Sequence, residues 1–335
     1  MVDKIKTTAA GSDTPPRNKE TIKNNNMSNA KKYIFLLVAT LLLTGLLSSC
    51  LKEDFSDCPR PFRLFIKAVD ADEVDITDSG DVQQVILFVF NEKGEIVDAV
   101  VLDAAAVKSR KPVDVKLDYP GHQSLTFVAW GNTGGVEFPD KASVKQLNDL
   151  YAKLKARDGK IKEQNQNGIA QSPSDLFQGS LSVPIEYGSI EPSGDQTVII
   201  RRKTAQVFIS AIHLKQWNGN KEGNYFFRLK ESLNTYDQNG NLIGTTVNYI
   251  PVSQLQDGTL TAPIFNTYPT GTGQSYTLEI LFDDEVIYTA NKGTDGKAFV
   301  PEAGRLLNII IDFRGGLNVV VVITPWDVIH QYVAY

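Results

Sequence analysis

The residue whose chemistry is most sharply indicated is Cys50, which ends the tetrapeptide Leu47-Ser48-Ser49-Cys50. This tetrapeptide resembles a bacterial lipobox, in which the cysteine thiol receives a diacylglyceryl group before the preceding segment is removed. One acyl chain holds a protein only marginally, whereas a cysteine with more than one chain stays in a bilayer. We therefore predict a covalent lipid on Cys50 and no other cofactor. The alternative is a cysteine that follows an apolar segment by chance.

The segment before this cysteine has the features of an export signal. It starts with Lys31-Lys32, and the residues from Tyr33 to Leu47 carry neither charge nor proline. This run is shorter than the roughly 20 residues of a permanent membrane helix, and small residues follow it, which predicts a cleaved signal peptide. Because residues 1–26 are polar, we expect the true start at Met27 and assign 1–49 to an upstream extension and signal peptide.

Charged residues follow the predicted lipidation site directly. Lys52, Glu53 and Asp54 resemble the export signal that sends Bacteroidetes lipoproteins to the outer face of the outer membrane. We therefore expect a lipid-anchored outer-membrane protein exposed on the cell surface, with residues 50–58 as the linker. The alternative is an ordinary solvated linker on a periplasmic lipoprotein.

Composition narrows the functional class of the protein. The whole chain of 335 residues carries a net charge of −5, and the pI near 5.4 gives no basic field for nucleic acid. The cysteines are Cys50 and Cys58, so lipidation of the first leaves no disulfide framework. The part after Cys50 is long enough for two domains of ordinary size.

Residue types that support catalysis are sparse and scattered. The three histidines, His122, His213 and His330, show no metal-ligand spacing, and no nucleophile motif is present. Asp283-Asp284 falls where a hairpin turn is expected, and the acidic stretch from Asp70 to Asp81 does not match a calcium-binding EF-hand. We therefore predict that the protein is not an enzyme and holds no metal.

Apolar residues alternate with polar ones along most of the chain. Strands are predicted from Phe62 to Val69 and from Val82 to Phe90, the second with a hairpin partner from Glu95 to Leu102. A final hairpin joins Arg305 to Phe313 with Leu317 to Ile323.

One helix is predicted from Ser143 to Ala156, where apolar residues recur at spacings of three and four. Many short strands with one helix predict a mainly β fold of two tandem β-sandwich domains, with the helix in the first. The domains are placed at 59–200 and 201–335.

Four segments of the chain resemble the FimB/Mfa-type fimbrial anchoring subunits of Bacteroidetes. They are CPRPF at 58–62, DITD at 75–78, VQQVILFVF at 82–90 and VAWGN at 128–132. This resemblance implies that the two sandwiches are transthyretin-like, and that a surface lipoprotein attaches a type V fimbria to the outer membrane. The implied partners are a fimbrial stalk subunit and, through the lipid, the membrane.

The resemblance also implies a contact of the strand-exchange type with the stalk, because related stalk subunits polymerise by β-augmentation. The carboxy-terminal segment Asn318 to Tyr335 is a candidate edge for contact. The candidate exchanged or groove-filling strand carries Phe62, Leu64, Ile66 and Ala68. The alternative is that both segments are ordinary core strands of a monomer. Cleavage at Arg60 or Arg63 would separate the lipid from the body, which argues against maturation there.

Two other functions share these sequence features. A surface glycan-binding or adhesive lipoprotein would have the same lipobox and sandwiches, with Trp217, Tyr225 and Trp326 as candidate contacts for an unidentified glycan or host ligand. A fimbrial tip or accessory subunit is the second alternative. A glycan-binding protein would bind as a monomer, whereas an anchor would bind a fimbrial subunit.

Overall fold

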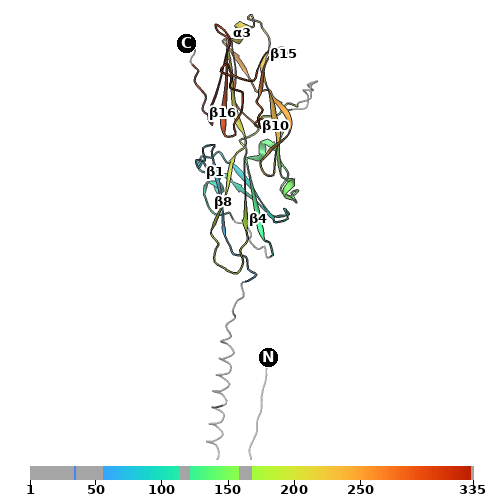
Figure 1. Cartoon of the computed structure of the whole chain (residues 1–335), viewed down its shortest axis with the longest axis vertical. Coiled ribbons are helices and arrows are strands. Elements are labelled where there is room, and N and C mark those ends of the chain that lie inside the picture. Colours follow the sequence, from blue (N-terminus) through green and yellow to red (C-terminus); the bar gives the residue numbers. More distant parts are fainter. Residues whose placement is uncertain (1–33, 35–55, 114–120, 158–167, 333–335) are drawn as a thin grey trace, which may run out of the picture. The chain divides into compact units, whose positions relative to one another are not determined.

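Strands with alternating apolar residues form three sheets in the computed structural model, which describes residues 34, 56–113, 121–157 and 168–332 (Figure 1). The described residues from 56 to 332 belong to one compact unit. The mainly β fold expected from the sequence is therefore confirmed. Among the described residues, no helix is long and apolar enough to cross a membrane.

The first sheet has six strands in the order β1-β8-β7-β4-β2-β3. β2 and β3 form the predicted hairpin, and β2 is buried on both faces as expected. β1 pairs with β8 in parallel, whereas the other neighbours are antiparallel. A short helix, α2 (Ala104–Lys108), follows β3. The strands are β1 Arg63–Val69, β2 Gln84–Asn91, β3 Ile96–Asp103, β4 Ser124–Gly131, β7 Phe177–Pro184 and β8 Asp195–Arg202.

The second sheet has the order β15-β14-β10-β6-β5, and β11 also pairs with β10. Its turn between β14 and β15 contains Asp283-Asp284, as predicted. The strands are β5 Val136–Glu137, β6 Tyr151–Leu154, β10 Tyr225–Asp237, β11 Leu242–Tyr249, β14 Thr277–Phe282 and β15 Glu285–Ala290. Strands from both sides of residue 200 share this sheet, so the placement of a domain boundary there stays a prediction.

The third sheet has the order β12-β13-β9-β16-β17. β16 and β17 form the predicted final hairpin, whose register runs from Arg305 opposite Pro325 to Asp312 opposite Asn318. α3 (Leu214–Trp217) follows β9. The strands are β9 Ala205–Ile212, β12 Gln254–Gln256, β13 Thr259–Thr267, β16 Arg305–Asp312 and β17 Asn318–Pro325.

The helix predicted from Ser143 to Ala156 is wrong. This segment contains a single 3₁₀ turn, Leu147–Asp149, followed by β6. Leu150, Ala152 and Leu154 are buried in alternation, a period of two that the helical spacing obscured. β6 pairs with β10 on one side and β5 on the other, so sheet pairing decides the local structure over intrinsic propensity.

The apolar side chains gather in two clusters. One lies on a single face of the first sheet and includes Leu64, Val85, Phe127 and Ile200. The other joins Phe88 and Trp130, which share the first sheet, to the interior between the second and third sheets. The first sheet therefore contributes buried residues to both clusters.

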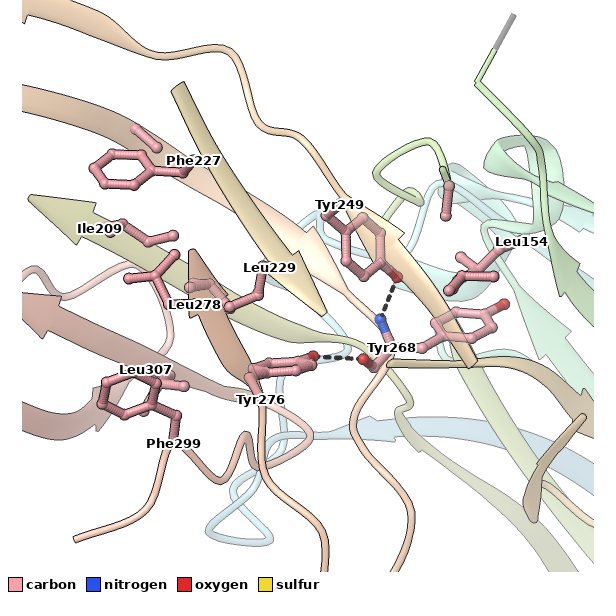
Figure 2. Packing of buried hydrophobic residues seen from close by; sticks show 14 of the residues in the cluster. Leu154, Ile209, Phe227, Leu229, Tyr249, Tyr268, Tyr276, Leu278, Phe299 and Leu307 are labelled. Atoms are coloured by element: carbon pink, nitrogen blue, oxygen red, sulfur yellow. Dashed lines mark hydrogen bonds between the residues drawn. The ribbon is translucent and has the colours of Figure 1, made fainter. Parts of the chain in front are cut away.

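A network of buried tyrosines fixes the interior of the larger cluster (Figure 2). The backbone N–H of Tyr268 donates to the hydroxyl of Tyr249 at 2.9 Å, and the Tyr276 hydroxyl donates to the Tyr268 carbonyl at 2.6 Å. Burial raises the pKa of all three phenols, so they stay neutral hydrogen-bonding groups. We interpret the network as structural, because satisfied buried polar groups specify one packing arrangement.

Candidate functional site

The predicted lipidation site lies outside the described residues. Cys50 and the export residues Lys52, Glu53 and Asp54 therefore stay predictions. The second cysteine, Cys58, is described as an exposed free thiol.

The four candidate residues of the exchanged strand lie on or beside β1, and their side chains are buried. Leu64, Ile66 and Ala68 are at most 6% exposed and face the smaller apolar cluster. Phe62, just before the strand, meets Phe127 edge to face with ring centroids 5.9 Å apart. The described strand therefore fills a groove in its own sheet, and whether it is ever exchanged stays a prediction.

The backbone of β1 is paired on one side and partly covered on the other. On the side of β8 the parallel register runs from Arg63 opposite Asp195 to Val69 opposite Arg201. On the opposite side the N–H of Ala68 donates to the Thr77 hydroxyl at 3.0 Å. The loop that follows the strand thus folds back over its outer edge.

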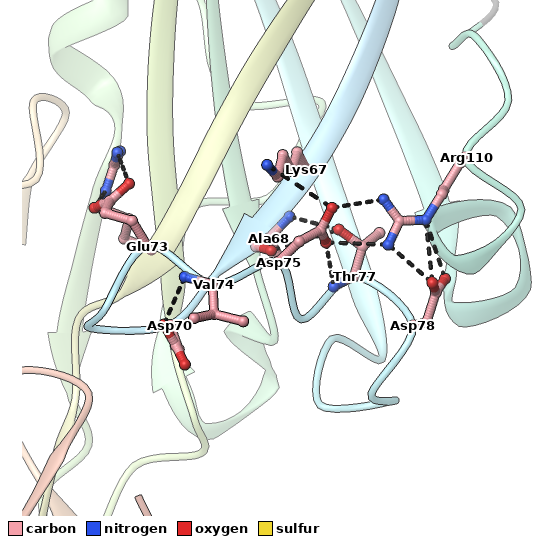
Figure 3. Close-up of polar contacts among 10 residues, drawn as sticks. Lys67, Ala68, Asp70, Glu73, Val74, Asp75, Thr77, Asp78 and Arg110 are labelled. Atoms are coloured by element: carbon pink, nitrogen blue, oxygen red, sulfur yellow. Dashed lines mark hydrogen bonds and ion pairs between the residues drawn. The ribbon is translucent and has the colours of Figure 1, made fainter. Parts of the chain in front are cut away.

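Arginine side chains hold that loop, which runs from Asp70 to Asp81 (Figure 3). Arg110 binds Asp75 at 2.7 Å and Asp78 at 2.8 Å. Hydrogen bonds from Arg110 and Thr77 hold the pKa of Asp75 well below its ordinary value. The described residues contain no group of His, Cys, Asp and Glu side chains suited to a metal ion.

Two further carboxylates of the loop reach strands that are distant in sequence. Glu73 accepts two hydrogen bonds of 2.7 Å from Arg201 on β8, which lowers the pKa of Glu73. Asp72 is paired with both terminal nitrogens of Arg305 on β16. The loop therefore ties the first sheet to the third.

A buried arginine lies where the first sheet passes into the third. The side chain of Arg202, which is 3% exposed, binds Asp81 at 2.5 Å and Asp175 at 2.8 Å. Its guanidinium also lies over Phe177 at 5.1 Å and over Trp326 at 4.4 Å from the ring centroids. Burial raises the pKa of Asp175 to about 6, against the opposing effect of Arg202.

The carboxy-terminal candidate segment begins with β17, which is the edge strand of the third sheet. Beyond β17, the chain is fastened to the same sheet. Asp327 and Gln206 exchange two hydrogen bonds of 2.8 and 2.6 Å, and the N–H of His330 donates to Asn308 at 3.0 Å. These hydrogen bonds hold the described part of the carboxy-terminal segment, up to residue 332, against the third sheet.

Within the described residues, the outer backbone edge of β17 is hydrogen-bonded to another segment only near the start of the strand. Val319 and Thr294 exchange two hydrogen bonds, of 2.7 and 2.8 Å. No described strand continues this pairing along the edge. Ile323 further along the strand is 40% exposed. This edge can accept an additional strand by β-augmentation.

The three candidate aromatic contacts do not form one platform. Trp217 is 46% exposed and packs on Phe313 with ring centroids 4.5 Å apart. Tyr225 is nearby, since its hydroxyl accepts a hydrogen bond from Asn218, but it is buried. Trp326 stacks instead on Arg202.

A cleft of about 390 Å³ opens where β13 departs from regular pairing with β9. Its wall includes Pro251, Pro263 and Phe265, with Arg157 on the lining. Arg157 donates to the carbonyl of Ile250 at 2.6 Å, so its guanidinium supports the wall.

The sequence did not indicate the ion pairs around the loop, although it indicated the loop itself. Arg202 and Arg305 lie 121 and 233 residues from the loop carboxylates that they bind, Asp81 and Asp72. No local sequence pattern indicates an ion pair between residues so far apart in the chain. The available signal was the excess of aspartates in a short loop, which arginines from other segments can pair.

The described chain is therefore a β-sheet protein. Its surface presents the edge strand β17 and the ion-paired loop from Asp70 to Asp81. A model of the family described as fimbrillin-A associated anchor proteins Mfa1 and Mfa2 matches residues 55–332. The chain therefore belongs to this family, as the resemblance predicted, and the family is one of anchor proteins rather than of enzymes.

Individual relatives agree with this assignment. The chain is 44% identical over 315 residues to the major fimbrium anchoring subunit FimB of Porphyromonas gingivalis, which covers 92% of this chain and 100% of that protein. FimB of a second strain matches equally. Among solved structures, the fimbrial anchor protein Mfa2 from Porphyromonas gingivalis aligns with a TM-score of 0.56 and 17% identity, over 82% of this chain and 100% of that one. That likeness concerns the fold.

Proposed function

We propose that this protein anchors a fimbria to the outer membrane through a lipid on Cys50. The observation that carries the proposal is the 44% identity to a fimbrial anchoring subunit along that subunit's whole length. The segment from Lys31 to Asp54 supports it, because an export signal, a lipobox cysteine and charged residues follow one another in the order that a surface lipoprotein requires. The protein acts at the cell envelope and without catalysis.

The partner in this proposal is a fimbrial stalk subunit that adds an extended segment to the sheet edge at β17. The edge is open beyond Val319 in the described chain, and partly exposed apolar side chains flank it. Main-chain hydrogen bonds would supply affinity there, and side chains of alternate residues would supply selectivity. β1 is a weaker candidate for this contact, because its apolar side chains are already buried in its own sheet.

Electron microscopy of cells and culture medium tests the anchoring role. A strain carrying Cys50→Ser is compared with the parent and with a Cys58→Ser strain, which loses the exposed thiol but keeps the lipid acceptor. We expect fimbriae to be shed into the medium only with Cys50→Ser. Fimbriae that stay cell-bound in that strain, with the protein present at the parental level, would favour a glycan-binding lipoprotein instead.

A further inference from the structure

The chain enters and leaves the first sheet through two strands that lie side by side. β1 (blue) is the first strand of the chain, and β8 (yellow-green) continues through Lys203 and Thr204 into β9 of the third sheet (Figure 1). Because β1 and β8 run in parallel, the start of β1 and the end of β8 lie at opposite ends of the pair.

The pairing begins before β1 itself. The carbonyl of Cys58 accepts a hydrogen bond from Gly188 at 3.1 Å, and the N–H of Arg60 donates to Glu186 at 2.7 Å. The carbonyl of Pro61 then accepts from Ser193 at 2.8 Å. The entering chain is therefore bound to the segment before β8 from Cys58 onward.

Ion pairs reinforce both ends of this contact. Arg63 binds Asp195, its direct partner in the register, through two hydrogen bonds of 2.7 and 3.0 Å. At the other end Arg201 on β8 binds Glu73, which follows β1. Two-pronged arginine–carboxylate contacts of this kind hold a fixed geometry.

The apolar cluster opposes sliding of one strand along the other. Leu64, Ile66 and Ala68 of β1 pack with Val198 and Ile200 of β8 in the same cluster. A shift by one residue would turn the buried side of β1 outward. Movement along the strand axis therefore has to break the core as well as the backbone ladder.

From this arrangement we infer that the β1–β8 pair is a mechanical clamp that carries tension between the membrane-side end of the chain and the third sheet. A pull on the start of β1 against the end of β8 acts along both strands and loads all ladder hydrogen bonds together. A pull on two neighbouring ends would break the same bonds one after another. The inference rests on the proposed function, which supplies the tension: a lipid holds one end of the protein and a fimbria pulls on the other.

The exit from the clamp is also braced. Arg202, the last residue of β8, is bound by Asp81 and Asp175, and Asp72 binds Arg305 on β16. β9 then pairs in parallel with β16 along its length, from Gln206 opposite Leu306 onward. Tension leaving β8 is thereby shared with neighbouring segments and does not fall on the two linking residues alone.

Single-molecule force spectroscopy on the chain from Cys50 onward tests the clamp in two pulling geometries. Cys50 is one handle in a Cys58→Ser background, and the second handle is a cysteine at an exposed position. Glu222→Cys, beyond β9, loads the strands in shear, whereas Ile190→Cys, in the loop before β8, peels β1 away from its start. We expect a severalfold higher rupture force in the first geometry, since forced unfolding follows the barrier that the load must cross. Equal rupture forces in the two geometries would overturn the inference.

A backbone substitution gives a second test with a matched control. The N–H of Arg63 faces the segment before β8, and that of Ala68 faces Thr77 on the other side, so the N–H of Lys67 faces β8. Lys67→Pro removes this donor, whereas Lys67→Ala removes only the partly exposed side chain. We expect the shear rupture force to fall for Lys67→Pro and to stay unchanged for Lys67→Ala.

The clamp and the anchoring role can fail separately. A folded Lys67→Pro protein with the parental rupture force would refute the clamp, whether or not fimbriae stay attached to cells. If Lys67→Pro does not fold, the comparison of rupture forces in the two pulling geometries still tests the clamp. Fimbriae that stay attached with Cys50→Ser would refute the anchoring role and leave the rupture forces as they are.

Discussion

Asp72 and Arg305 are 233 residues apart in the sequence and form a two-pronged ion pair that joins the loop after β1 to β16. The arginine side chain is 22% exposed and the aspartate 58% exposed, so water and salt screen their attraction. The pair therefore contributes more to the placement of the loop than to the free energy of unfolding.

The first prediction concerns this pair. We expect Arg305→Ala to lower the free energy of unfolding by at most about 1 kcal/mol, and the loss to shrink as salt is added. Urea unfolding at low and high salt measures both effects. Lys297→Ala is the control, because Lys297 pairs only locally with Asp295. A loss of several kcal/mol at Arg305 would show that the pair is shielded from solvent.

The second prediction concerns Arg202, whose environment differs from that of Arg305. Its side chain is 3% exposed, and removal leaves Asp81 and Asp175 beside a vacant buried site. We expect Arg202→Ala to destabilise the protein by about 3–5 kcal/mol, as for other broken buried ion pairs. Arg202→Ala combined with Asp175→Asn should recover part of this loss, because the stranded buried charge is then gone. No recovery in chemical unfolding would mean that the aromatic contacts of Arg202 carry the effect.

The third prediction is a pH dependence at Asp175. Burial raises the pKa of this carboxyl from 3.8 to about 6, so the folded protein binds the proton more tightly than the unfolded chain. The protonated group therefore favours folding at low pH, and this contribution is lost as the pH rises from about 4 to about 6, by roughly 3 kcal/mol. We expect Asp175→Asn to gain stability relative to the parent over this interval.

Asp312 provides the control of opposite sign. Hydrogen bonds from Arg314 lower its pKa from 3.8 to about 2, so its stabilising contribution is present above about 4 and is lost as the pH falls toward 2. Asp312→Asn should therefore lose stability relative to the parent as the pH rises from 2 to 4. Unfolding curves of the parent and the two variants from pH 2 to pH 6 measure both differences. A stability difference between Asp175→Asn and the parent that stays constant from about pH 4 to about pH 6 would contradict the shift at Asp175.

One strand that the sequence predicted well is β1, in which alternation coincides with burial. Leu64, Ile66 and Ala68 alternate with outward residues in β1, and the sequence places this strand within one residue of its observed start. β16 and β17 were predictable for another reason: a glycine-containing turn joins two runs rich in isoleucine and valine, although β16 is buried on both faces.

Features that depend on distant partners escaped prediction. Val144, Leu147 and Leu154 have a helical spacing, but β10 supplies the hydrogen bonds that make Tyr151–Leu154 a strand. The carboxylates that bind Arg202 come from the loop after β1 and from the segment before β7, which no pattern of one sequence connects. The sequence indicated that the segment from Phe62 to Val69 is a strand. It did not indicate that this strand pairs with β8.

The last prediction addresses the open edge at β17. The N–H and carbonyl of Val319 point outward to Thr294, so by alternation the N–H of Ile323 also points outward, away from β16. Ile323→Pro would remove an edge donor without breaking the hairpin, whereas Ile323→Ala would trim the side chain and keep the donor. In a pull-down with the purified stalk subunit, we expect Ile323→Pro to weaken binding much more than Ile323→Ala. Equal binding by both variants and the parent, with the folded state verified by circular dichroism, would exclude this edge as the site of strand addition.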